Sequence, residues 1–321
     1  MKVCVKTPAR LHLGLIDLNG SLGRIFGGLG VGINRPNIIL EARPSEKLSV
    51  AGQETEAVRA LANRFLQAYH IKASASLDLK QTIPAHVGLG SGTQLALAVA
   101  TALAKLFNVQ ASTRELAVSM GRARRTGIGT AIFEKGGFVV DGGKTLKNDA
   151  SPAETFPPVI FHQSFPEDWR YVVAIPNVSK GLTNDEETSA FGKLPCMSTE
   201  DVGKICRLTM MKLLPALAER DIGNFGEALT QIQNTVGDYF AQVQGGRYSS
   251  SAAAETIAFM QKLGAHGTGQ SSWGPTVYAL TRKEEAKPIQ LKVQAFLAKG
   301  VGGQVFTAKP NNTGASVKFT K

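Results

Sequence analysis

The sequence predicts an α+β protein built of two domains. The chain has 321 residues, a length that suits two domains or one large one. Its first half is rich in glycine and in strand-like segments, whereas most of the second half reads as helices flanked by strands. The stretch 147–158 between them is polar and contains three prolines. We therefore expect one domain over 1–155 and a second over 156–321.

The first elements are predicted to be strands. Residues 1–8 read as a strand rather than as a signal peptide. Polarity then alternates as in a hairpin strand, with leucines at 11, 13 and 15 set against Arg10, His12 and Gly14. A glycine-rich loop is expected at 27–32, and a helix with one apolar face at 58–69.

The segment 84–96 is the most informative part of the chain. Residues 75–83 before it alternate as a half-buried strand does, and 95–106 after it carry an apolar helical face. Glycines at 88, 90 and 92 let the backbone adopt positive φ and approach a ligand. The new helix offers unpaired N–H groups and a partial positive charge. Strand, glycine loop and helix thus predict a phosphate site, the alternative being a simple tight turn.

The remaining elements follow from spacing and turn residues. A helix is expected at 113–120, with Ser112 and Glu115 forming a capping box. Residues 127–143 read as a glycine loop, a turn and a buried strand. The second half is predicted to hold a strand at 169–175, helices at 184–192, 199–219, 221–242 and 249–263, a strand at 273–281, a helix at 283–298, and strands at 304–308 and 315–319.

Charge suggests a polyanionic partner. The net charge is +11, from 36 lysines and arginines against 25 acids. Such a balance invites a nucleic-acid function, but the charge is dispersed, and the one dense cluster is at 122–125. A small phosphorylated substrate explains the charge equally well. We therefore expect no nucleic-acid partner.

Cysteine usage and hydropathy indicate a soluble, cytoplasmic protein. The three cysteines, Cys4, Cys196 and Cys206, are far apart and odd in number, which argues against a disulfide framework. They also lack metal-ligand spacing. No apolar run is long enough to span a bilayer, so no membrane association is expected.

Three glycine-containing motifs resemble those of the GHMP small-molecule kinases, in the same order and over essentially the whole chain. Residues 8–13 read Pro-Ala-Arg-Leu-His-Leu, similar to a first motif that is often Pro-Ala-Lys-Ile-Asn-Leu. Residues 84–96 resemble the phosphate loop, and 264–274 the C-terminal glycine motif. The resemblance implies a ribosomal protein S5 domain 2-like N-terminal domain, a ferredoxin-like C-terminal domain, and an active site between them.

The motifs depart from the kinases where phosphoryl transfer occurs. The kinases often carry an aspartate after the phosphate loop, but residues 126–130 hold no acid. The second serine of the phosphate loop is Gly92, and the lysine of the first motif is Arg10. Arginine stays charged and serves poorly as a base. An ATP-dependent kinase is therefore the alternative function.

The altered motifs resemble the β-ribofuranosylaminobenzene 5′-phosphate synthase family of tetrahydromethanopterin biosynthesis. Gly-Leu-Gly-Ser-Gly-Thr-Gln at 88–94 and Gln-Ser-Ser-Trp-Gly-Pro-Thr at 270–276 are the most specific. This resemblance implies that 4-aminobenzoate or 4-hydroxybenzoate is joined to 5-phosphoribosyl-1-pyrophosphate, with loss of CO2 and pyrophosphate. It also implies a homodimer. Magnesium is expected to bridge the pyrophosphate oxygens, and no pyridoxal phosphate or nicotinamide cofactor is expected.

The loop, the arginines and the resemblance together define a candidate site. The catalytic candidates are Arg10, His12 and His86. The phosphate- or substrate-binding candidates are Gly88, Gly90, Ser91, Gly92, Thr93, Gln94, Arg24, Arg122, Arg125, Thr130, Gln270, Ser271, Ser272 and Trp273. Guanidinium groups suit phosphate because they bind it bidentately. The sequence does not identify the metal ligands, and Asp17 is the one candidate.

Each candidate has a structural alternative. His12 can be a satisfied strand histidine, and His86 can stabilise its own loop. At least one arginine of the 122–125 cluster is expected to be solvated, because adjacent helix positions cannot all face one ligand. Asp17 can form a turn with Asn19 and Gly20 instead of binding a metal. Residues 139–145 are expected to be a strand and turn, and 271–273 can be a turn alone.

Overall fold

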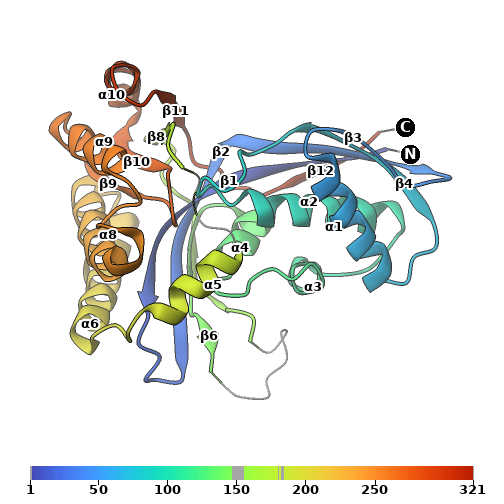
Figure 1. Cartoon of the computed structure of the whole chain (residues 1–321), viewed down its shortest axis with the longest axis horizontal. Coiled ribbons are helices and arrows are strands. Elements are labelled where there is room, and N and C mark those ends of the chain that lie inside the picture. The colour runs from blue at the N-terminus through green and yellow to red at the C-terminus, as the bar shows by residue number, and fades with distance from the viewer. Residues whose placement is uncertain (1, 147–154, 180, 182–183, 321) are drawn as a thin grey trace.

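The computed structural model describes residues 2–146, 155–179, 181 and 184–320. Within them, eight strands form a large sheet: β1 (Lys2–Asp17), β2 (Arg24–Ser45), β3 (Ser49–Gly52), β4 (Ser74–Gln81), β5 (Phe138–Asp141), β6 (Lys144–Thr145), β7 (Val159–Gln163) and β12 (Ser316–Thr320). The strands follow the order β12-β1-β2-β4-β3 (Figure 1). In addition, β5 and β6 pair with β2, and β7 pairs with β5. β1 and β2 form a long antiparallel hairpin, which confirms the predicted hairpin strand.

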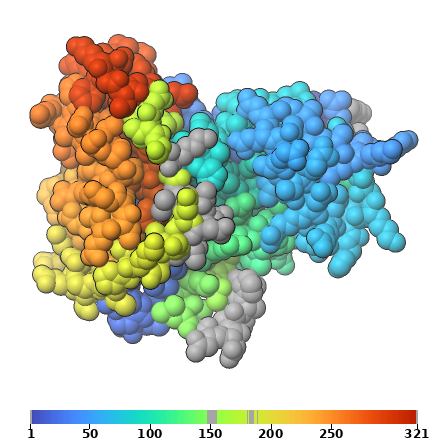
Figure 2. Space-filling model, in the orientation of Figure 1, coloured from blue at the N-terminus to red at the C-terminus, as the bar shows by residue number. Residues whose placement is uncertain are grey.

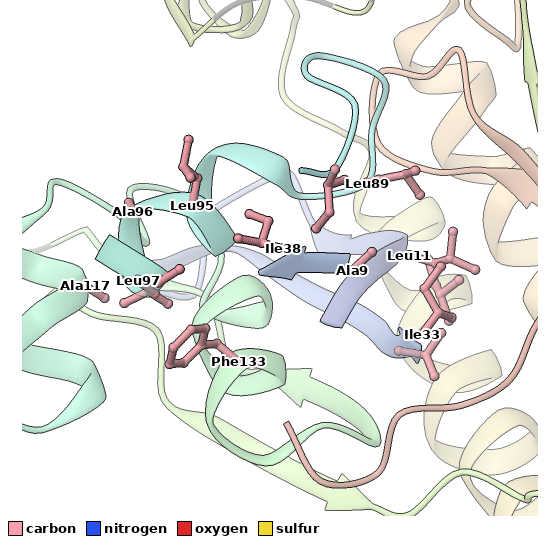
Figure 3. Packing of buried hydrophobic residues seen from close by; sticks show 14 of the residues in the cluster. Ala9, Leu11, Ile33, Ile38, Leu89, Leu95, Ala96, Leu97, Ala117 and Phe133 are labelled. Atoms are coloured by element: carbon pink, nitrogen blue, oxygen red, sulfur yellow. The ribbon is translucent and has the colours of Figure 1, made fainter. Parts of the chain in front are cut away.

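Among the helices of the first half, α1 (Thr55–Ala68), α2 (Ser91–Leu106) and α4 (Ile128–Lys135) pack on this sheet, and α3 (Thr113–Ser119) packs on α2 and α4. α2 contacts β1 and β2 and is buried along most of its length. Figure 3 shows side chains of α2, such as Leu97, close to Ile38 of β2 and Phe133 of α4. The capping box of Ser112 and Glu115 on α3 is confirmed.

Two predictions in the first half were wrong. Residues 27–32, expected as a loop, belong to β2, and most of 127–135, also expected as a loop, is helix α4. The glycines are there for packing: a Cβ atom at Gly30 would lie 2.3 Å from Cγ2 of Ile128, and one at Gly28 would lie 2.8 Å from Cγ1 of Ile128. Glycines in this strand therefore let α4 approach the sheet closely.

The second sheet has the ferredoxin-like arrangement. Its strands β8 (Trp169–Pro176), β9 (Gly267–Gln270), β10 (Val277–Arg282) and β11 (Gly303–Ala308) are antiparallel neighbours in the order β11-β8-β10-β9. Its chain order is strand, helices, two strands, helix, strand. The helices are α5 (Asn184–Lys193), α6 (Thr199–Leu208), η1 (Thr209–Leu213), α7 (Leu214–Glu219), α8 (Ile222–Gln244), α9 (Ser251–Lys262) and α10 (Lys283–Ala298). The predicted elements of this half are confirmed, except that the strand expected from 273 begins at Val277.

Two lobes result (Figure 2), and one apolar core joins them. Beyond the expected boundary at 155, β7 and β12 return to the large sheet. One apolar cluster runs from Leu13 of β1 to Ile232 of α8. The polar stretch 147–154 lies outside the described residues, so the boundary itself stays a prediction. No helix in the described part of the chain has the length and apolarity needed to cross a bilayer.

Candidate active site

The predicted phosphate loop connects β4 to α2. Gly88 and Gly90 adopt left-handed φ values of +88° and +79°. A Cβ atom at Gly88 would lie 2.2 Å from the backbone oxygen of Ser271, and one at Gly90 would lie 2.8 Å from Cγ of Arg10. Both positions therefore require glycine, because the backbone conformation and the neighbours exclude a side chain. The loop is confirmed as a glycine turn that leads directly into a helix.

Arg10 braces this loop from β1. Its Nη1 donates a hydrogen bond of 2.8 Å to the carbonyl oxygen of Gly88, and its backbone N–H donates to Leu89 over 3.2 Å. Burial lowers the pKa of Arg10 to about 10, and the nearby Glu187 carboxylate opposes that shift. Arg10 is therefore still a cation at neutral pH, held beside the start of α2.

His12 is a neutral, buried neighbour of Arg10. Its side chain is 8% exposed. Burial, followed by the charge of Arg10, lowers the pKa of His12 to about 3. Its backbone N–H donates to Oγ of Ser271 (2.9 Å), and that hydroxyl donates to the carbonyl oxygen of Gly88 (2.6 Å). Ser271 thus ties β1, the glycine loop and the C-terminal motif together, and His12 offers no positive charge to a phosphate.

Two adjoining cavities lie between the lobes. The loop cavity, about 440 Å³, is lined by the phosphate loop and by His86. The aromatic cavity, about 240 Å³, is lined by Phe191, Phe240 and Trp273. The residues that line both are Arg10, Thr93, Arg122, Glu187, Ser272 and Trp273. These volumes suit small molecules, and the shared wall indicates one continuous site with two compartments.

Three rings form the apolar wall of the aromatic cavity. The ring centroids of Phe240 and Trp273 are 4.7 Å apart, and Phe191 lies 5.6 Å and 5.7 Å from them. All three pairs meet edge to face, which is a favourable geometry for aromatic side chains. The guanidinium of Arg125 lies 5.0 Å from the ring centroid of Phe191. This compartment can therefore hold a flat ring that carries negative charge.

The arginine cluster divides between the cavities and solvent. Arg122 lines both cavities, and its buried Nε has no hydrogen-bond partner among the described residues. Its Nη1 lies 3.4 Å from where a Cβ atom of Gly92 would be, at the start of α2. Burial and the charges of Arg124 and Arg64 lower the pKa of Arg122. Arg124 is exposed, as expected for one member of the cluster, although it also borders the aromatic cavity. The cluster lies in the loop between α3 and α4 and not on the expected helix.

Several sequence candidates lie outside the compartments. Gln94 is fully buried and donates to the carbonyl oxygen of Gly129 over 2.8 Å, so it joins α2 to α4. Thr130 is buried within α4. Arg24 donates to the carbonyl oxygens of Gly142 (2.7 Å) and Gly143 (2.6 Å), beside the tip of the β1–β2 hairpin. The structure therefore does not bring these three residues to the walls of either cavity described above.

Asp17 forms a turn with Asn19 and Gly20, the alternative to the predicted metal-binding role. Its Oδ1 accepts hydrogen bonds from the backbone N–H groups of Asn19 (2.7 Å) and Gly20 (3.0 Å). Among the residues that the structure describes, no three histidine, cysteine or carboxylate side chains gather as a metal-binding group. Residues 138–141 form β5, and a turn follows as expected, with Asp141 accepting from Gly127 and Gly143 over 2.9 Å each.

Glu187, Phe191 and Phe240 line the site but were not predicted from the sequence. Glu187 and Phe191 lie on α5, and Phe240 lies on α8. Several acids stand near the start of α5, and nothing in their spacing indicates which one faces the site. The two phenylalanines have the helical spacing of ordinary core residues, so only the meeting of α5, α8 and Trp273 identifies them as a cavity wall.

Comparisons with known proteins agree with this geometry. The model of the GHMP kinases N terminal domain matches residues 55–137, and that of the GHMP kinases C terminal domain matches 213–299. The chain is 38% identical to "Beta-ribofuranosylphenol 5'-phosphate synthase" of Archaeoglobus fulgidus, over 98% of this chain and 99% of the relative. It is 34% identical to the protein of the same name from Methanocaldococcus jannaschii, with the same coverage.

Solved structures show the same fold. Homoserine kinase from Cytophaga hutchinsonii superposes with a TM-score of 0.70 at 18% identity, over 99% of this chain and 97% of that one. Mevalonate kinase from Methanococcus jannaschii gives 0.68 at 14% identity, over 96% and 98%. These likenesses establish the two-lobed α+β architecture.

Proposed function

Because the chain belongs to the GHMP kinase superfamily and, within it, to the family of beta-ribofuranosylphenol 5'-phosphate synthases, we propose that it is a decarboxylating phosphoribosyltransferase. The proposed substrates are 5-phosphoribosyl-1-pyrophosphate and 4-hydroxybenzoate or 4-aminobenzoate. The products are a C-riboside 5′-phosphate, CO2 and pyrophosphate, in a step of tetrahydromethanopterin biosynthesis.

One observation carries this proposal: a cationic phosphate loop shares a wall with an aromatic compartment. Arg10 and Arg122 face both cavities, and the buried Nε of Arg122 still has a hydrogen bond to give. A phosphorylated sugar next to a flat aryl acid needs these two environments side by side. We place the pyrophosphate in the loop cavity, on the N–H groups at the start of α2, and the aryl ring between Phe191, Phe240 and Trp273.

The residues can do this chemistry by orientation and electrostatics. Fixed cations stabilise the charge that builds on departing pyrophosphate without having to reorganise. The aromatic walls hold the aryl ring so that the carbon bearing the carboxylate faces the anomeric carbon. The para hydroxy or amino group supplies electron density to that carbon, so no electron-sink cofactor is required. Neutral His12 can accept or donate a hydrogen bond near Arg10, but does not compete with it for an anion.

We further propose that magnesium accompanies the pyrophosphate. Magnesium keeps several waters and binds through few protein ligands when phosphates are present. The hydroxyls of Ser91 and Thr93 are hard oxygen donors on the wall of the loop cavity, so the donor set fits such an ion. When bound, the ion would neutralise charge on the leaving group.

A kinase is the second candidate, because the fold is that of GHMP kinases. The site argues against it: residues 126–130 hold no acid, and a Cβ atom at Gly129 would lie only 3.0 Å from Cγ2 of Thr93. A catalytic aspartate at 129 would therefore press on the wall of the site.

The test measures both products. The protein is incubated with magnesium, 5-phosphoribosyl-1-pyrophosphate and carboxyl-labelled benzoate substrate, without nucleotide. We expect CO2 and pyrophosphate in equal amounts. ATP-dependent phosphorylation of a small alcohol, without decarboxylation, would refute the proposal in favour of the kinase.

We also propose a cytoplasmic location and a dimeric state. Cys4, Cys196 and Cys206 are all unpaired, which suits a cytoplasmic setting. The family resemblance suggests a homodimer, which light scattering at defined protein concentration would test.

A further inference from the structure

Glu187 lies where the two cavities meet. It is on α5 and is one of the residues that line both compartments. Its Oε2 lies 2.5 Å from Nη1 of Arg125, and both side chains are 22% exposed. The carboxylate is therefore fixed in position, but it still reaches the space that a substrate would occupy.

Glu187 also stands out by charge. Among the described residues that line the aromatic cavity, it is the only carboxylate. The same walls carry five arginines: Arg10, Arg122, Arg124, Arg125 and Arg247. Such a set of cations suits phosphates and an aryl carboxylate, but an acid among them weakens the binding of any anion. Glu187 is paired with Arg125 on one side, and the carboxylate also faces the substrate space, where it would stabilise a positive charge that develops on the substrate.

The position of the reacting carbon supplies that charge. If the pyrophosphate occupies the loop cavity and the aryl ring the aromatic cavity, the bond between ribose and ring forms at their shared wall. The para substituent of the ring then points away from this wall. Glu187 is thus near the anomeric carbon rather than near the hydroxy or amino group.

We propose that the carboxylate of Glu187 is a catalytic residue that stabilises the positive charge developing on the ribose. This inference rests on the proposed function. The bond from the anomeric carbon to the pyrophosphate oxygen breaks, and its electron pair leaves with pyrophosphate. The ring carbon that bears the carboxylate forms the new carbon–carbon bond. The bond to the carboxylate then breaks, its electron pair restores the aromatic ring, and CO2 departs. Charge balances without an added proton, oxidant or reductant.

The ion pair with Arg125 holds the Glu187 carboxylate in place. Burial raises its pKa, while the charges of Arg125, Arg10 and His86 lower it. Arg125 comes from the loop before α4, Arg10 from β1 and His86 from the phosphate loop. Three different segments therefore place charges near the Glu187 carboxylate. Arg125 also stacks on Phe191 and acts as a positioning residue for Glu187. A preorganised carboxylate of this kind is effective in the transition state because it need not reorganise.

The test replaces Glu187 by glutamine, which keeps size and hydrogen bonding but removes charge. We expect Glu187→Gln to lower kcat roughly a hundredfold, with less than a threefold change in KM for 5-phosphoribosyl-1-pyrophosphate. The matched control is Glu186→Gln, the same change at the exposed neighbour on the same helix, which should keep wild-type kcat. Thermal melting of both variants checks the fold.

Four other outcomes would overturn the assignment. Unchanged kcat in Glu187→Gln shows that the carboxylate is dispensable. A higher magnesium requirement with recovery of kcat at saturation shows a metal ligand. A loss confined to 4-hydroxybenzoate, while 4-aminobenzoate still reacts normally, shows a base for the para group. A higher KM with normal kcat shows that Glu187 binds the substrate without stabilising the transition state. If instead wild-type protein releases neither CO2 nor pyrophosphate, the proposed function itself fails, which is distinguishable from all four.

Discussion

At the scale of single residues, Arg10 combines two roles that a lysine could not. Its guanidinium donates to the carbonyl oxygen of Gly88 and at the same time lines both cavities. A planar fork with several donors can hold a loop oxygen and still face an anion, whereas an ammonium is a compact point charge. The replacement of the kinase lysine therefore preserves the cation and adds a brace for the phosphate loop.

Arg10→Ala should weaken binding of the phosphoribosyl substrate. Loss of one charge-assisted contact costs about 2 kcal/mol, or roughly thirtyfold in binding. We expect KM for 5-phosphoribosyl-1-pyrophosphate to rise by about that factor and KM for the benzoate to change little. Steady-state kinetics with each substrate varied in turn measures both. The control is Arg43→Ala, an exposed arginine on β2. If only the benzoate KM rises, Arg10 binds the aryl carboxylate instead.

Gly90→Val should abolish turnover while the protein stays folded. A side chain there would collide with Arg10 and force the loop away from the phosphate. Gly264→Val is the matched control, because Gly264 also has a positive φ, +88°, but no atom lies within 4 Å of its Cβ position. Activity assays and circular dichroism on both variants make the comparison. Full activity of the Gly90 variant would mean that the loop is only a turn.

At the scale of elements, the packing of α4 on β2 decides the shape of the wall behind the site. Gly30 leaves room for Ile128, so Gly30→Ala should destabilise the protein by about 1–3 kcal/mol through overpacking. Removing the opposing methyl groups should relieve part of that cost. We expect Gly30→Ala in an Ile128→Ala background to be less destabilising than in wild type. Urea denaturation of all four proteins gives the coupling, and strict additivity would contradict the proposed contact.

Asp141 joins β5 to the start of α4 and should make stability depend on pH. Burial raises the pKa of Asp141 to about 6, although the N–H groups of Gly143 and Gly127 act to lower it. In the unfolded chain such a carboxyl titrates near ~3.9. The folded-state pKa is higher than the unfolded-state pKa, so protonation of Asp141 favours the folded state. This stabilisation is complete below about pH 4 and is lost as pH rises through about 6.

Between these pH values, the free energy of unfolding should fall by roughly 3 kcal/mol because of Asp141, since one pKa unit corresponds to ~1.4 kcal/mol. The free energy of unfolding of wild type and of Asp141→Asn is compared by urea denaturation at pH 4 and pH 7. The decrease between these two pH values should be larger in wild type by about that amount. Equal decreases in the two proteins would show that Asp141 does not carry this pH dependence.

At the scale of the whole molecule, the net charge of +11 is expected to serve a small polyanion. Dispersed charge gives only weak nucleic-acid binding that falls steeply with salt, because many counterions are released. A substrate with few phosphates in a cleft between lobes is far less sensitive to salt. We expect no measurable binding of duplex or single-stranded nucleic acid at physiological salt, where turnover persists. Filter binding and turnover assays across a salt series test this, and submicromolar sequence-selective binding would contradict it.

The sequence by itself determined the fold class, most helices and strands, and the phosphate loop. These depend on local properties: apolar periodicity, glycine at positive φ as at Gly88 and Gly90, and capping residues such as Ser112. The two glycine segments that were predicted wrongly depend instead on contacts between distant parts of the chain. Gly28 and Gly30 are required by a neighbour about a hundred residues away, Ile128, and no local pattern shows that contact.

Only the tertiary structure decided which side chains make the site. Glu187 and Phe191 lie on α5 and Phe240 lies on α8, and each has an ordinary sequence context. The fold brings them to one wall because α5 and α8 of one lobe pack toward the loops of the other. The role of Glu187 depends on its distance from Arg125 and Arg10 in the folded protein, because electrostatic interactions depend on distance in space. The positions of these residues in the sequence do not reveal that distance.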